Sequence, residues 1–85
     1  INGWNLNEAG TLLSKDYSTR NFSSAIEFIN KVAAIAEDEY HHPDIHLTAY
    51  RKVRIELTTH VLNGISKNDF IVAAKIDQLP IELKG

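Results

Sequence analysis

The second half of the chain holds two neighbouring stretches in which apolar and polar residues alternate, and this alternation restricts the fold more than any other feature. The stretches are residues 45–50 and 53–60. Successive side chains of a β-strand point to opposite faces, so each stretch should form a strand with one apolar and one polar face. Strands of this kind build antiparallel sheets that cover a core on one side only. The polar face, with Arg54, Glu56 and Thr58, should therefore meet solvent or a partner.

Two further elements are expected before these strands. Residues 3–17 show a shorter alternation, broken by turn-forming residues at 7–10, which is typical of a β-hairpin. From Phe22 the apolar period changes to three and four residues, the period of an amphipathic helix. Ser24 and Glu27 have the spacing of a capping box near the start of this helix. Its expected buried face consists of Phe22, Ile26, Ile29, Val32, Ala33 and Ala36.

Pro43 limits the first helix, because a proline disfavours helical backbone at the residue before it. The helix should therefore end near Tyr40 or His41. Its last turn carries three consecutive acidic residues, 37–39, at the end where the helix dipole favours cations. This unfavourable placement suggests that some of these carboxylates serve a site.

A second helix is expected after Gly64. Ser66 and Asp69 have capping-box spacing at its start, and Pro80 limits its end. Its expected buried face consists of Phe70, Ala73, Ala74 and Ile76. The element order β-β-α-β-β-α predicts an α+β fold in which a four-stranded antiparallel sheet carries both helices on one face. Residues 1–85 are expected to form a single domain.

Composition favours a domain held together by an apolar core. The chain has no cysteine, which excludes disulfides and thiolate metal sites, and 44% of its residues are hydrophobic. A chain of 85 residues lies near the small end of what folds alone, so oligomerisation is expected to add stability. There is no methionine even at the first position, and we expect the sequence to begin downstream of its natural start.

The charge balance argues against nucleic acid as a direct partner. Nine Lys and Arg residues against eleven Asp and Glu residues give a net charge of −2, the wrong sign for binding a phosphate backbone. No apolar run has the length of a membrane span, and no signal-peptide pattern opens the chain. We expect a cytoplasmic location, with import into an organelle left open because a targeting segment would lie upstream.

Three of the four histidines lie where predicted elements end. His41 and His42 fall at the exit of the first helix, and His60 falls at the end of the last strand. Histidine has an unperturbed pKa of roughly 6.5, so it donates and accepts protons near neutrality. With no cysteine and no serine in a recognisable nucleophile setting, acid–base chemistry is the natural hypothesis. The spacing alone is explained equally well by ordinary surface histidines.

One long motif resembles a known family. The pattern Glu37-x3-His41-His42-Pro43-x6-Tyr50-x9-His60-x8-Asp69 is similar to the signature of the pterin-4a-carbinolamine dehydratases. Gly3-Trp4 in the first strand, the phenylalanine-rich start of the first helix and Thr59 before His60 agree with the same family. The gap between Pro43 and Tyr50 is one residue longer than in the animal enzymes. The family's usual N-terminal helix is missing, consistent with a trimmed start.

The resemblance implies a lyase that removes water from a 4a-hydroxytetrahydropterin to give the quinonoid dihydropterin. This elimination requires one proton delivered to the leaving hydroxyl and one removed from a ring nitrogen, which two histidines can achieve without metal or nucleotide cofactor. Carried over from the family, His41 and His60 are the acid–base pair and His42 holds the substrate. The family also pairs its subunits, which implies a homodimer or homotetramer.

The remaining motif residues each have a structural alternative. Asp69 and Glu37 could orient imidazoles or bind the pterin, but Asp69 also fits a helix cap and Glu37 a solvated helix position. Tyr50 could line the substrate pocket or cover the sheet. His46 matches no motif position, which favours a surface role.

Two other functions compete with the dehydratase hypothesis. A zinc site is disfavoured, because adjacent side chains such as His41 and His42 diverge and no helical His-x3-His spacing occurs. A protein-binding role is the stronger rival, since the family also includes a transcription coactivator and Rubisco assembly factors. The assembly factors tend to lose the histidines, so their presence here favours an enzyme, with a dual role left open.

Overall fold

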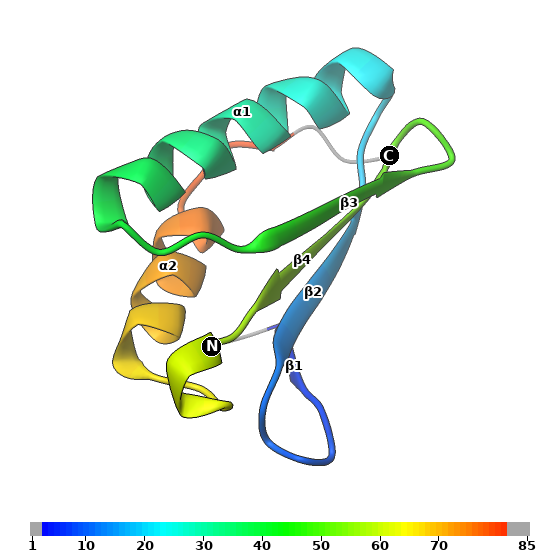
Figure 1. The fold of residues 1–85 in the computed structure, drawn as a ribbon. Coiled ribbons are helices and arrows are strands. Elements are labelled where there is room, and N and C mark those ends of the chain that lie inside the picture. Colours follow the sequence, from blue (N-terminus) through cyan, green and yellow to red (C-terminus); the bar gives the residue numbers. More distant parts are fainter. Residues whose placement is uncertain (1–2, 82–85) are drawn as a thin grey trace.

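The computed structural model describes residues 3–81, which form one sheet and two α-helices (Figure 1). The strands are β1 (Asn5–Leu6), β2 (Leu13–Ser18), β3 (Asp44–Thr48) and β4 (Lys52–Leu57). The helices are α1 (Phe22–Glu39) and α2 (Lys67–Asp77), and a short 3-10 helix, η1 (His60–Leu62), follows β4. The predicted fold class and the order β-β-α-β-β-α are confirmed. The η1 segment is not among the predicted elements.

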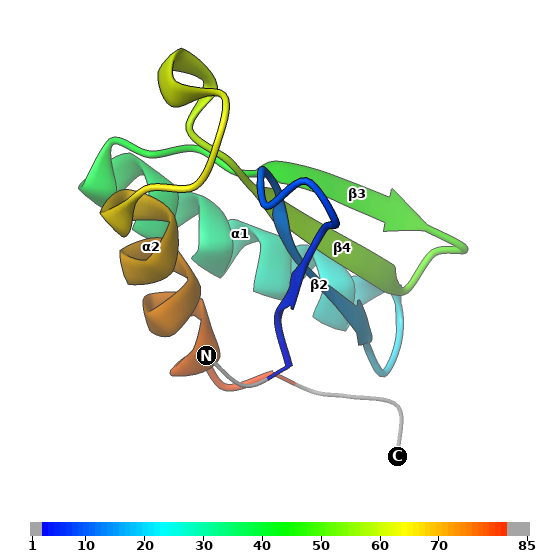
Figure 2. The same cartoon turned by 90° about the horizontal axis from the view of Figure 1, so that it is seen from below.

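The sheet brings the exits of α1 and β4 to one end of the molecule. All strand pairs are antiparallel, and the order across the sheet is β1-β2-β4-β3. Asp44, at the start of β3, pairs with Glu56 near the end of β4. The chain enters β3 from α1 and leaves β4 toward η1, so these two connections lie at the same end of the sheet (Figures 1 and 2).

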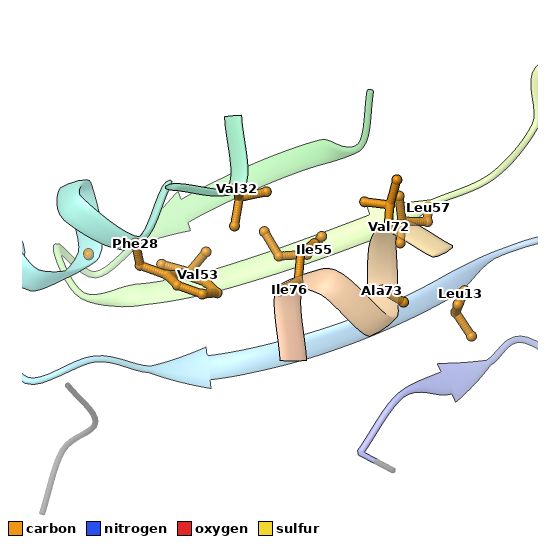
Figure 3. Packing of buried hydrophobic residues seen from close by; sticks show 10 residues of the cluster. Leu13, Phe28, Val32, Val53, Ile55, Leu57, Val72, Ala73 and Ile76 are labelled. Carbon is orange, nitrogen blue, oxygen red and sulfur yellow. The ribbon is translucent and has the colours of Figure 1, made fainter. Parts of the chain in front are cut away.

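The core lies between the sheet and the two helices (Figure 3). Val53, Ile55 and Leu57 of β4 are at most 1% exposed. The other buried hydrophobic members of the cluster are Leu13, Ala25, Phe28, Val32, Val72, Ala73 and Ile76. Full burial of one large aliphatic side chain contributes about 1.5–3 kcal/mol to stability, so β4 is a firm support for the segments that extend from it.

The buried face of α1 differs from the predicted one. The buried hydrophobic side chains are Ala25, Phe28, Val32 and Ala36. Phe22 and Ile26, which the periodicity placed in the core, are 53% and 37% exposed. The helix is apolar on two adjacent stripes, so spacing alone could not choose between them. Packing decides the choice, because the Phe28 ring lies against Tyr17 of β2 with 4.7 Å between ring centroids.

The start of α1 also differs from the prediction, whereas its end agrees. Asn21 is the N-cap, and its side-chain oxygen accepts a hydrogen bond from the Ser24 amide at 2.8 Å. Ser24 is thus inside the first turn, and the predicted capping box with Glu27 is wrong, because asparagine caps as well as serine does. The helix ends at Glu39, as the proline at position 43 predicted.

Two strands end earlier than predicted. β3 stops at Thr48, because Ala49 and Tyr50 take left-handed backbone with φ of 48° and 55° and form the turn into β4. β4 stops at Leu57, and the Thr59 amide then donates to the Gly64 carbonyl at 2.8 Å and closes a loop around η1. His60 is therefore the first residue of η1 and not the last residue of a strand.

The predicted capping box of α2 is confirmed, with Ser66 as the N-cap and Asp69 in its third helical position. Its buried face only partly matches the prediction. Ala73 and Ile76 are buried, but Phe70 is 46% exposed and Val72 takes its place in the core. Ala74 is also exposed.

Candidate active site

His41 is positioned by the exit turn of α1. Tyr40 adopts left-handed backbone with φ of 50° and ends the helix. The His41 amide still donates to the Ala36 carbonyl oxygen at 3.1 Å, so the residue stays attached to the last turn. Its side chain is only 14% exposed and reaches α2, where its Nε2 lies 2.5 Å from Oδ1 of Asp69.

Asp69 is a fully buried carboxylate. Burial by itself raises the pKa of a carboxyl group, because it penalises the charged form. In Asp69 this effect is outweighed by hydrogen bonds from His41, from the Ser66 amide and from the Thr59 hydroxyl, and by the charge of His41, so the pKa of Asp69 lies below its usual value. The carboxylate is therefore ionised at neutral pH and acts only as a hydrogen-bond acceptor.

The ionised carboxylate fixes the tautomer of His41. An acceptor-only group at 2.5 Å requires that Nε2 of the imidazole carry the hydrogen. The second ring nitrogen, Nδ1, is then the one that can take up or release a proton on a substrate. The same carboxylate stabilises the imidazolium form by a charge-assisted hydrogen bond.

The other oxygen of Asp69 is held by two residues that surround η1. The Thr59 hydroxyl donates to Oδ2 at 2.8 Å, and the Ser66 amide donates to the same oxygen at 2.8 Å. The hydroxyls of Thr59 and Ser66 are 2.7 Å apart. Thr59 immediately precedes His60, so the contacts from His41 through Asp69 to Thr59 connect the elements that carry the two histidines.

His60 itself is exposed at the start of η1. Among residues 3–81 no other side chain is hydrogen-bonded or ion-paired to its ring. Its ring is therefore available to a ligand. The next two side chains, Val61 and Leu62, are 93% and 63% exposed and make an apolar rim beside it.

His42 belongs to a second, more open pair. Its Nε2 lies 2.5 Å from Oε2 of Glu37, and the two side chains are 60% and 76% exposed. Another member of the acidic run, Glu39, forms an ion pair with Lys75 of α2. The acidic end of α1 thus holds one imidazole and one lysine, which accounts for two of its three anions.

Tyr50 is not brought to the histidines within this chain. It lies in the β3–β4 turn, at the opposite end of the sheet from the α1 exit (Figure 1). The five residues of β3 separate the two positions by roughly 17 Å at the usual rise of a strand. The Tyr50 ring is 62% exposed and stacks near the Arg51 guanidinium, at 5.7 Å.

The sequence of residues 1–79 matches a family model described as pterin 4 alpha carbinolamine dehydratase. The chain belongs to this family. A relative from Arabidopsis thaliana named pterin-4-alpha-carbinolamine dehydratase 2, mitochondrial, is 44% identical over 96% of the chain, and the chain spans 45% of that protein's length.

Solved structures show the same fold. One, a transcriptional coactivator/pterin dehydratase from Brucella melitensis, has a TM-score of 0.83 and 30% identity, with 91% of this chain and 81% of that chain covered. A second, described as a pterin dehydratase-like protein and RuBisCO assembly factor in the alpha-carboxysome, has a TM-score of 0.72 and 22% identity over 88% of this chain and 86% of that chain. The second likeness concerns the fold alone.

The pterin dehydratase motif residues thus fall into two groups in this chain. His41, His42, Glu37 and Asp69 lie in two histidine–carboxylate pairs, whereas Tyr50 lies in the β3–β4 turn. His60, at the start of η1, belongs to neither group. Within residues 3–81 no three His, Asp or Glu side chains are arranged to hold a metal ion. No helix in that same range has the length and apolar character needed to cross a bilayer.

In the sequence, Thr59 stands out only as the neighbour of His60, and Ser66 only as a helix cap. The signal was available for Ser66, because a capping-box serine lies next to the carboxylate that it caps. It was available for Thr59 only as the neighbour of His60. Its contact with Asp69 spans ten residues and depends on how η1 folds back.

Proposed function

We propose that the protein is a hydro-lyase that dehydrates a 4a-hydroxytetrahydropterin to the quinonoid dihydropterin, with His41 and His60 as the acid–base pair. One imidazole gives a proton to the 4a-hydroxyl, which leaves as water. The other removes a proton from a ring nitrogen, and the electrons of that N–H bond form the new double bond. Atoms and charge balance without a cofactor.

The observation that carries the proposal is the buried His41–Asp69 pair. A fully buried carboxylate that holds a largely buried imidazole at 2.5 Å is an arrangement that clusters at functional sites, and capping α2 does not by itself require the imidazole. His41 becomes an imidazolium when Nδ1 takes up a proton, and it is an imidazolium before Nδ1 gives one up. The Asp69 carboxylate stabilises this charged form in both cases. η1, which begins at His60, lies at the same end of the sheet as the exit of α1 (Figure 1), and His60 is exposed there, which supports its role as the partner group.

His42 and Glu37 fit a role in holding the substrate. Both side chains are exposed, so their charges are screened by solvent and they are poorly placed for strong electrostatic stabilisation. The amino-pyrimidine edge of a pterin presents hydrogen-bond donors and acceptors of the kind that an imidazole and a carboxylate recognise. In this proposal their loss raises KM more than it lowers kcat.

The test is the dehydration of a 4a-hydroxytetrahydropterin by the purified protein, measured against the uncatalysed rate. His41→Ala and His60→Ala should each lower turnover by about 10²–10⁴-fold, the usual contribution of a positioned acid or base. His46→Ala is the matched control, because His46 is half-exposed on the other face of the sheet and, among residues 3–81, its side chain pairs with Glu56 alone, at 2.9 Å. Wild-type turnover in both His41→Ala and His60→Ala, or an equal loss in the control, would contradict the assignment.

A second candidate function is protein binding, and the exposed apolar stripe of α1 favours it. Phe22 and Ile26 lie one turn apart on this stripe, and both are more than one third exposed. We propose that this surface pairs with a second copy of the chain in a homodimer or homotetramer. Light scattering of the purified protein should give a multiple of the monomer mass, and Ile26→Asp should shift it toward the monomer. A monomer mass for the unmodified protein at micromolar concentration would refute the pairing.

A further inference from the structure

The two proposed catalytic histidines lie on separate elements, and a small hydrogen-bonded cluster joins them. The cluster consists of Thr59, Ser66 and Asp69. Thr59 contacts the cluster through its hydroxyl, and its backbone closes the loop from which His60 emerges, because its amide donates to the Gly64 carbonyl at 2.8 Å. Thr59 therefore contacts the carboxylate that holds His41 through its hydroxyl, and it closes the loop that carries His60 through its amide.

The hydrogen bonds of Thr59 have a definite direction. Asp69 is an ionised acceptor, so the Thr59 hydroxyl must donate its hydrogen to Oδ2, at 2.8 Å. The Ser66 hydroxyl lies 2.7 Å from the Thr59 hydroxyl and 3.5 Å from Oδ2, so at the shorter distance it donates to Thr59. With the Ser66 amide also on Oδ2, this oxygen is saturated, and Oδ1 is left for His41 alone.

We propose that Thr59 is a positioning residue for the dehydratase reaction, which holds the Asp69 carboxylate in the rotamer that serves His41 while anchoring the main chain at His60. Without its hydroxyl, the carboxylate loses one of its two strong anchors on Oδ2 and can rotate about its Cβ–Cγ bond. The His41 ring then loses its fixed orientation, and Nδ1 is no longer held toward the substrate. This inference rests on the proposed function for its kinetic part, but its structural part stands without substrate.

The kinetic test compares Thr59→Val with Thr59→Ser. Valine has the shape of threonine without the hydroxyl, and serine restores the hydroxyl without the methyl group. Thr59→Val should lower kcat about 10- to 100-fold with KM changed less than about threefold, the range seen when a residue that orients a ligating or catalytic histidine is lost. Thr59→Ser should recover most of the lost kcat.

Thr58→Val separates positioning from stability. The Thr58 hydroxyl is also part-buried in this loop, where it donates to the Thr11 carbonyl at 2.6 Å and lies 3.3 Å from the Gly64 carbonyl, so its contacts are with main-chain oxygens and not with Asp69. The Thr58→Val variant should have a melting temperature lowered about as much as that of Thr59→Val, and its kcat should stay near the wild-type value. An equal loss of kcat in Thr58→Val and Thr59→Val, or no recovery in Thr59→Ser, would overturn the positioning role.

The second readout is the ring NMR signal of His41 in the ligand-free protein. The unmodified protein should show a slowly exchanging Nε2–H proton shifted far downfield by the Asp69 carboxylate. Thr59→Val should broaden it or speed its exchange, and Thr59→Ser should not. Because no substrate is present, this result holds even if the protein proves inactive on 4a-hydroxytetrahydropterins. An unchanged His41 signal in Thr59→Val would refute the inference whether or not the protein is a dehydratase.

Discussion

Asp69→Asn separates the charge of the buried carboxylate from its shape, and it is the sharpest test of the site. An asparagine fits the same space, and its amide oxygen can still accept the hydrogen bonds of Ser66 and Thr59. Its NH₂ group then faces His41, whose Nε2 must become an acceptor. The imidazole is thereby driven to the other tautomer, with the hydrogen on Nδ1 where the substrate should bind.

The cost in stability follows from the three hydrogen bonds that lose their charge. They are the bonds at 2.5 Å from His41, 2.8 Å from Ser66 and 2.8 Å from Thr59. A bond to a charged group contributes about 1.5–3 kcal/mol and a neutral one about 0.5–1.5 kcal/mol, so each bond weakens by about 1 kcal/mol. The total of about 3 kcal/mol should lower the melting temperature by roughly 10–20 °C in a domain of this size.

The stability difference should depend on pH in one direction. The pKa of Asp69 is lowered in the folded protein, against desolvation by burial, by hydrogen bonds from His41, Ser66 and Thr59. Its charge therefore stabilises the folded state at pH values above the unfolded pKa of about 3.9, and this contribution is lost as the pH falls through the lower folded pKa. Thermal unfolding of the two proteins should differ most near pH 7 and converge in acid below about pH 4.

The activity should fall far more than the stability. Loss of the correct tautomer costs about 10⁴-fold in other enzymes that pair a histidine with a buried aspartate, so kcat for 4a-hydroxytetrahydropterin dehydration should fall by about 10²–10⁴-fold. The assay is run at a temperature where circular dichroism shows the variant fully folded. A folded Asp69→Asn protein with wild-type kcat would show that Asp69 only caps α2, and the reasoning about His41 would fail.

Three further changes have expected outcomes. Glu37→Gln should raise KM for the pterin by about three- to tenfold with kcat nearly unchanged, since the Glu37–His42 pair is exposed; a fall in kcat as large as that of Asp69→Asn would contradict this reading. Tyr50→Ala should leave both constants near wild type, and a large loss would show that Tyr50 reaches a site through a second copy of the chain. Ile55→Ala should destabilise the domain by about 2–5 kcal/mol in denaturant unfolding, because Ile55 is fully buried, and a loss below about 1 kcal/mol would mean that the site end of β4 is loosely packed.

The fold could be predicted from the sequence where one pattern had one solution. The alternation in residues 45–50 and 53–60 admits only half-covered strands, and the proline at position 43 leaves α1 one place to end. The prediction failed where the local sequence fitted two arrangements equally well. Both stripes of α1 are apolar, and only the contact between Phe28 and Tyr17 selects the buried one. Likewise, Ala49 and Tyr50 are unusual residues for a left-handed hairpin turn, so the alternation predicted a strand that includes them.

The site could be predicted only as a set of residues, because its geometry depends on long-range contacts. The motif indicated His41, His60 and Asp69, and local spacing indicated that Asp69 caps a helix. Neither pattern contains the 2.5 Å contact between His41 and Asp69, which joins residues 28 positions apart and forms only when α2 packs beside the exit of α1.

The cap and the histidine contact are compatible because a carboxylate has two oxygens. The Ser66 amide of the capping box and the Thr59 hydroxyl both donate to Oδ2, and these two hydrogen bonds together set the orientation of the carboxylate. Oδ1 is consequently directed away from the helix end, toward His41. The folding of α2 thus pre-orients the carboxylate before any substrate binds, which is the condition for stabilising an imidazolium without reorganisation. At Asp69 the losses of stability and of activity are therefore coupled. At Thr59 the loss of kcat should exceed that of a variant with an equal loss of stability, because the Thr59 hydroxyl orients the carboxylate while the Ser66 cap of α2 stays in place.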